Sequence, residues 1–73
     1  NKNNSAISIK AKIKKIIEQE LYEDIIYSDK NIADILMKEN IKVARRTVAK
    51  YRESLNIANS LVRSKKVIYN YNN

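Results

Sequence analysis

Several residue types are missing from this sequence, and each absence narrows what the protein can be. The 73 residues include no Cys, His, Gly, Pro, Trp or Phe. Without Cys no disulfide can form, and without both Cys and His a structural zinc site is effectively excluded. An enzyme is disfavoured as well, because the sequence has no His, no Cys, no Gly-rich phosphate loop and no acids gathered around a nucleophile. We therefore expect a domain without catalytic activity, metal or cofactor.

The lack of Gly limits how helices can end. Many helices end on a residue in the left-handed conformation, which is usually Gly and otherwise Asn. Asn40 and Asn56 each follow a segment with helical apolar periodicity. We therefore expect each of these two residues to end a helix in the left-handed conformation.

Long apolar runs are also missing. No stretch approaches the roughly 20 apolar residues that a transmembrane helix needs, and nothing resembles a signal peptide, so we expect no membrane partner. At 73 residues the chain can form one small domain, which buries a smaller share of its surface than a larger protein would. The chain does not begin with Met, and we expect it to be a piece of something longer.

Positive charge is in excess, and it is unevenly distributed. The net charge is +7 and the sequence pI is about 9.8. From Glu18 to Glu39 there are seven acids against two lysines, whereas from Lys42 to Arg52 there are five cations and no acid. A surface suited only to solubility would mix the two signs. The segregation favours a polyanionic partner that meets one basic surface.

Apolar residues recur at three- and four-residue spacings in three segments, which predicts three helices. Ser5 is placed to cap a first helix over about residues 6–21. Ser28 is placed to cap a second helix that runs to about Glu39, and a third helix spans about residues 44–55. The residues expected to face the core are Ile9, Ile13, Ile16, Ile17 and Leu21 in the first helix, Ile32, Ile35 and Leu36 in the second, and Ala44, Val48, Tyr51 and Leu55 in the third.

These segments predict an all-α fold built as one small three-helix domain. Residues 1–4 show no apolar periodicity, and we expect a flexible arm there. Residues 5–57 hold the three helices and form the expected domain. Residues 58–73 are basic and then rich in Tyr and Asn, and we expect them to form a mostly disordered tail.

The second and third helices have the sequence outline of a helix-turn-helix, in which a short connector joins two helices and the second carries a basic outer face. Ala33 is small where the two helices must cross closely. Ala33 and Val43 are ten residues apart, about twice the spacing expected in the tightest form of the motif, so the first helix or the turn must be extended. Ile41 in the connector is expected to fill the core. The recognition helix would span about residues 44–55.

The outer face of the third helix carries the functional hypothesis. Advancing by about 100° per residue turns Val48 inward and Ala49 outward. Because Ala49 is the smallest side chain on that face, the helix backbone could approach the floor of a DNA groove while long cationic side chains extend around it. An Arg guanidinium matches the two acceptors of guanine in the major groove. We expect Arg45, Arg46, Ala49 and Lys50 at base edges, and Thr47, Tyr51 and Arg52 at the DNA backbone.

Plainer alternatives stay open for several of these residues. A basic outer face can simply be the solvated side of a core helix. For Tyr51, core packing with a solvated hydroxyl is the better explanation, with a phosphate contact in addition. For Arg52, a phosphate contact and a solvated charge carry equal weight.

Residues 44–53, with the sequence ARRTVAKYRE, resemble a known signature. They match letter for letter the ten-residue RpoN box, which marks the C-terminal domain of bacterial sigma-54 RNA polymerase factors. The resemblance covers about residues 5–57. Matching residues outside the box are Ile9, Lys10, Ile13, Lys14, Lys15, Ile17, Glu20, Ser28, Asp29, Ile32, Ser54 and Leu55.

The resemblance implies a specific function. The box helix would enter the major groove of double-stranded promoter DNA at the upstream GG element, called the minus-24 element. Arg45 and Arg46 would lie at the guanines, and Lys50, Tyr51 and Arg52 would support them at bases or backbone. The whole factor would bind core RNA polymerase and hold a closed promoter complex until an ATPase activator remodels it. We expect this domain to be monomeric and to act in the bacterial cytoplasm, at the nucleoid.

The main alternative is a nonspecific basic helical module that binds RNA or an anionic membrane surface through the first helix. The cations of that helix are Lys10, Lys12, Lys14 and Lys15. In that case changes at those lysines would matter more than changes at Arg45 and Arg46. A third possibility is a helical bundle that docks its basic face on an acidic protein.

Overall fold

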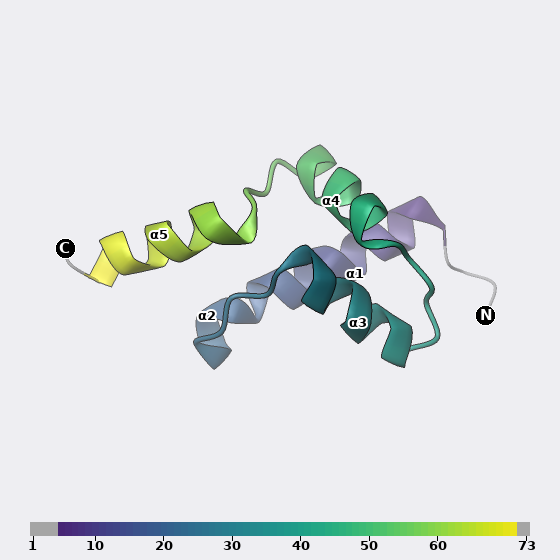
Figure 1. Ribbon diagram of the computed structural model, residues 1–73, viewed down its shortest axis with the longest axis horizontal. Coiled ribbons are helices and arrows are strands. Elements are labelled where there is room, and N and C mark those ends of the chain that lie inside the picture. The colour runs from purple at the N-terminus through teal and green to yellow at the C-terminus, as the bar shows by residue number, and fades with distance from the viewer. Residues whose placement is uncertain (1–4, 72–73) are drawn as a thin grey trace.

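The computed structural model describes residues 5–71, with side chains described for residues 5–65. These residues form five α-helices and no strand, so the prediction of an all-α domain is confirmed (Figure 1). The helices are α1 (Ala6–Glu18), α2 (Glu20–Glu23), α3 (Asp29–Lys38), α4 (Arg45–Ser54) and α5 (Ser60–Tyr71).

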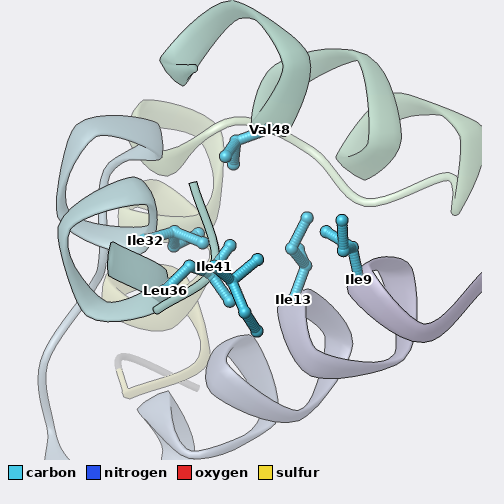
Figure 2. Packing of buried hydrophobic residues seen from close by; sticks show 6 residues of the cluster. All are labelled: Ile9, Ile13, Ile32, Leu36, Ile41 and Val48. Atoms are coloured by element: carbon cyan, nitrogen blue, oxygen red, sulfur yellow. The ribbon is translucent and has the colours of Figure 1, made fainter. Parts of the chain in front are cut away.

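Three of the helices, α1, α3 and α4, share one apolar core. Its buried residues are Ile9, Ile13, Ile32, Leu36, Ile41 and Val48. Figure 2 shows these side chains converging from α1, from α3, from the α3–α4 connector and from α4. Burying one side chain of this kind stabilises a fold by roughly 1.5–3 kcal/mol, so a core of this size leaves little stability to spare. Because α4 enters the core mainly through Val48, its opposite face is left open to a partner.

The helix starts are as predicted for α1 and α3. The Ser5 hydroxyl oxygen accepts a hydrogen bond from the backbone N–H of Ser8 at 3.2 Å. Ser28 and Asn31 form a reciprocal capping box, in which each side chain accepts from the backbone N–H of the other, at 3.1 and 3.2 Å. Such caps satisfy backbone donors that a helix start otherwise leaves without partners.

The helix ends confirm the prediction for the two asparagines. Asn40 and Asn56 have φ angles of 65° and 61°, in the left-handed region. After Asn40, the N–H of Ile41 donates to the carbonyl oxygen of Leu36 at 2.9 Å, which is the long hydrogen bond of a Schellman motif. Ile41 is thereby turned into the core, where it is buried. The left-handed Asn therefore both ends α3 and begins the turn that leads to α4.

The predicted first helix over residues 6–21 is wrong at its end. It is divided into α1 and α2, and Leu21 is 81% exposed, whereas Glu20 is buried. The spacing explains the error, because residues 9, 13, 16 and 20 recur at intervals of four, three and four, so the helical stripe continues at position 20. Because a charged side chain is expected at the surface, the sequence did not indicate that Glu20 points into the domain. The structure satisfies this carboxylate with the backbone N–H of Tyr27 at 2.8 Å and with Arg63.

The predicted disordered tail over residues 58–73 is also corrected, because Ser60–Tyr71 form α5. The side-chain oxygen of Asn59 accepts from the N–H of Val62 at 2.9 Å, which caps the start of the helix. Figure 1 shows α5 extending away from the three-helix core. The predicted arm at residues 1–4 and the last two residues, 72–73, lie outside the described residues.

Candidate nucleic-acid interface

The outer face of α4 brings the four predicted base-reading residues together. Val48 is buried in the core, while Arg45, Arg46 and Lys50 are exposed and Ala49 is half-buried. The helical phase predicted from the sequence is therefore correct at the centre of α4. It is wrong at Ala44, which was expected in the core but is the exposed N-cap residue.

An open hollow of about 530 Å³ lies beside this face. Its walls come from three helices: the start of α3, the outer face of α4 and the first residue of α5. The residues that line it are Ser28, Asp29, Lys30, Arg45, Arg46, Ala49 and Ser60. Since helix N-termini carry partial positive charge, the ends of α3 and α5 add to the field of the two arginines. The hollow is suited to an anion.

Three of the four cations of α4 are uncompensated. Arg45, Arg46 and Lys50 form no ion pair with any side chain that the structure describes. Some cations on other helices are paired: the Nζ atom of Lys12 lies 2.9 Å from a Glu39 carboxylate oxygen, and that of Lys30 lies 3.7 Å from Asp34. Unbalanced cations gathered on one face attract a polyanion.

The start of α4 differs from the starts of α1 and α3, which have serine caps. Ala44 at the N-cap makes no side-chain hydrogen bond, and the first turn holds no acid. It holds Arg45 and Arg46 instead, so two cations lie where the helix dipole favours anions. A helix start of this kind is unfavourable in isolation and is relieved by a bound phosphate.

Arg52 is not available to the DNA backbone as predicted. Its side chain is only 6% exposed, and its Nε atom lies 2.9 Å from a carboxylate oxygen of Asp29. The same guanidinium donates from Nη2 to the second oxygen of Asp29 at 3.2 Å and from Nη1 to the carbonyl of Ile57 at 2.9 Å. Position 52 follows Val48 by four residues, a spacing compatible with an inward side chain, but the positive charge favoured an exposed one. Arg52 therefore connects α4 to the start of α3. The prediction that it contacts the DNA backbone is wrong for this arrangement of the side chain.

Tyr51 packs against the apolar core while remaining half-buried, which agrees with the plainer explanation for it. The Nζ atom of Lys10 lies 5.5 Å from the centre of its ring, within range of a cation–π interaction. Thr47 is half-buried on the flank of α4. Phosphate contacts by the Tyr51 hydroxyl and by Thr47 remain predictions.

Four further polar residues at the hollow were not predicted as site residues. Ser28, Asp29 and Lys30 come from the start of α3 and Ser60 from α5, and only the tertiary fold brings them beside Arg45 and Arg46. The acid in the hollow, Asp29, is paired with Arg52, so its charge is largely compensated there. None of the described helices has the length and apolarity needed to cross a membrane.

Comparison with known proteins gives consistent matches. A family model described as "Sigma-54, DNA binding domain" matches residues 1–65. The chain is 54% identical over 56 residues to an RNA polymerase sigma-54 factor of Acinetobacter guillouiae, covering 77% of this chain and 11% of the relative. It is 51% identical over 61 residues to the factor of Azotobacter vinelandii, covering 84% of this chain and 12% of the relative.

A third relative is the RNA polymerase sigma-54 factor of Sinorhizobium fredii, 48% identical over 59 residues and covering 81% of this chain. The chain spans only 11% of that relative's length. No solved structure matches.

Proposed function

Because this chain belongs to the sigma-54 DNA-binding domain family, we propose that the outer face of α4 reads the upstream GG element of a promoter. The observation that carries the proposal is the set of exposed cations without ion-pair partners among the described side chains, Arg45, Arg46 and Lys50, around the small Ala49 on the face opposite Val48. Core packing does not account for these cations, because Val48 makes the core contact from the opposite face of the helix.

We propose that α3 and α4 act as a helix-turn-helix with an extended turn. Six residues, 39–44, separate the two helices, and buried Ile41 fastens this connector to the core. In such motifs the second helix lies in the major groove and the first crosses the backbone. Lys30 at the start of α3 is then positioned to meet a phosphate next to the groove.

Base reading falls to the N-terminal half of α4. Arg45 and Arg46 each offer a planar fork to the O6 and N7 acceptors of a guanine, a pairing worth about 1–3 kcal/mol of discrimination. Ala49 allows the helix to approach the base edges closely, and Lys50 reaches a further base or the backbone. Thr47 and the Tyr51 hydroxyl contact phosphates, which fixes the register of the helix without reading sequence.

The roles of the whole factor are proposed from its relatives. Since the chain corresponds to 11–12% of those sigma-54 factors, we propose that it is the promoter-binding part of a longer transcription initiation factor. That factor would bind core RNA polymerase and respond to an ATPase activator, in the cytoplasm at the nucleoid. The domain would act there as a monomer that binds DNA and catalyses no reaction.

A duplex-binding titration tests the proposal. The chain is titrated by fluorescence anisotropy against a labelled duplex containing the GG element and against the same duplex with GG changed to AA. We expect the GG duplex to bind more tightly by about 1–3 kcal/mol for each guanine that an arginine reads. Equal affinity for the two duplexes would contradict sequence reading by α4.

A further inference from the structure

The linker between α4 and α5 is held by two arginines, of which Arg52 is buried and Arg63 is half-buried. Arg52 donates from Nη1 to the carbonyl of Ile57, and Arg63 donates from Nη1 to the carbonyl of Ala58. Arg52 is anchored on Asp29 of α3, and Arg63 is anchored on Glu20 of α2. The carbonyls of Ile57 and Ala58 are therefore connected through these arginines to α3 and to α2. These contacts set the direction in which α5 leaves the core.

The pair of Arg63 and Glu20 is largely shielded from solvent and hydrogen-bonded on both carboxylate oxygens. The side chains are 11% and 6% exposed, and the distances are 3.0 Å from Nε and 2.8 Å from Nη2. Arg63 also donates to the carbonyl of Tyr27, and the N–H of Tyr27 donates to Glu20. A two-pronged pair of this kind fixes orientation as well as distance, so the first turn of α5 is held rigidly against α2.

That first turn carries Ser60 to the hollow beside α4. Ser60 lies three residues before Arg63 and lines the same cavity as Arg45, Arg46 and Lys30. The N-terminal end of α5 therefore lies beside the start of α3, and both border the face that the proposed function presents to DNA. The clamp at Arg63 connects this end of α5 to α2.

We propose that Arg63 is a positioning residue for DNA binding: its pair with Glu20 holds the first turn of α5 as a third wall of the hollow, where Ser60 meets a backbone phosphate. This rests on the proposed function, because it requires DNA to lie on the outer face of α4. The contact is to phosphate, so it raises affinity for every duplex by the same factor and leaves the preference for GG unchanged.

The first test introduces a negative charge at the wall. Ser60→Glu, in the full chain, is compared with Ser64→Glu, which makes the same change one turn further along α5. A carboxylate in the first turn of a helix favours the helix, so loss of binding by Ser60→Glu would not arise from unfolding of α5. We expect Ser60→Glu to weaken binding to GG and AA duplexes alike by at least about tenfold, as juxtaposed like charges do. Ser64→Glu should have a much smaller effect.

The second test asks whether Arg63 acts through position. Glu20→Gln and Arg63→Gln are combined, which removes both charges without leaving one buried alone. In that background α5 is no longer clamped, so adding Ser60→Glu should cost far less affinity than it does in the parent chain. A purely structural role for the pair would leave the cost of Ser60→Glu unchanged.

The outcomes separate the two proposals. Suppose that the parent chain prefers GG over AA. Equal losses of affinity in Ser60→Glu and Ser64→Glu would then contradict the phosphate contact at Ser60 and leave the proposed function standing. A parent chain that does not distinguish GG from AA would overturn base reading by α4, and one that binds neither duplex would overturn both proposals. If the double glutamine variant does not fold, shown by loss of far-UV circular dichroism, the comparison of the two serine variants still decides the phosphate contact.

Discussion

At the scale of single residues, the three arginines of α4 lie in two different environments. Arg45 and Arg46 are exposed at the hollow, whereas Arg52 is enclosed by Asp29 and a backbone carbonyl. Composition alone counts all three as positive charge. Of these three arginines, only the exposed pair is accessible to a partner at the hollow.

The first prediction concerns Arg46. Changing Arg46→Ala removes one guanidinium fork, so preference for GG over AA should fall by about 1–3 kcal/mol. The ratio of the two dissociation constants, from paired anisotropy titrations, is the measurement. Lys14→Ala is the matched control, since it removes one exposed cation from α1 and should leave that ratio unchanged. An unaltered ratio in Arg46→Ala would show that this side chain does not read a base.

The second prediction compares two neighbours on α4. Val48 is completely buried in the core and Ala49 lies on the outer face. Val48→Asp should unfold the domain, because an unpaired buried charge costs a large part of the roughly 5–15 kcal/mol that holds a native protein together. Ala49→Asp should stay folded and lose DNA binding. Far-UV circular dichroism and thermal melting distinguish the two, and a folded Val48→Asp variant would show that the assigned phase of α4 is wrong.

At the scale of helices and turns, the parts governed by neighbouring residues were predictable. The caps at Ser5 and Ser28 and the left-handed ends at Asn40 and Asn56 follow from local backbone chemistry, and the structure has all four. The inward position of Val48 also followed from the period of α4. Such features need only a few residues of sequence, so no knowledge of the tertiary fold is required.

The parts that depend on distant partners were not predictable in the same way. Arg52 and Asp29 are 23 residues apart, and Arg63 and Glu20 are 43 residues apart. Until the fold brings each acid to its base, a buried charge is indistinguishable in sequence from a solvated one. For this reason the sequence predicts a core stripe without Glu20 and a tail, not a helix, at residues 60–71.

The third prediction tests one helix end. Asn40 has a left-handed φ angle of 65°, a conformation that costs a side chain with a Cβ about 1–2 kcal/mol and that Asn tolerates. Asn40→Ala should therefore lower the free energy of unfolding by about 1 kcal/mol. Asn40→Gly should preserve it or raise it. Urea unfolding followed by circular dichroism measures both, and equal stabilities for the Ala and Gly variants would contradict a left-handed end to α3.

At the scale of the whole molecule, the question is which basic surface meets the polyanion. On α1, Lys12 is paired with Glu39 and Lys10 lies over the Tyr51 ring. Two of the four lysines of α1 therefore already have partners within the domain. This arrangement favours α4 over α1 as the surface that binds nucleic acid.

The fourth prediction compares the two surfaces at constant charge. The double variants Arg45→Ala/Arg46→Ala and Lys14→Ala/Lys15→Ala each remove two exposed cations. If α4 is the interface, the arginine variant should lose most of its affinity in anisotropy titrations at one salt concentration, because both guanidinium forks are gone. The lysine variant should remain close to the parent. The reverse result would favour the nonspecific module that binds through α1.

The missing cap at Ala44 has a consequence for motion in the free protein. With no side-chain acceptor and two like charges beside it, the opening turn of α4 should fray readily, so its amide protons should exchange quickly with solvent. Contact with DNA would supply the absent acceptors and slow that exchange, while the serine-capped starts of α1 and α3 change little. Part of the binding free energy is then spent on ordering the first turn of α4. Hydrogen–deuterium exchange at residues 45–47, with and without duplex, would measure this ordering.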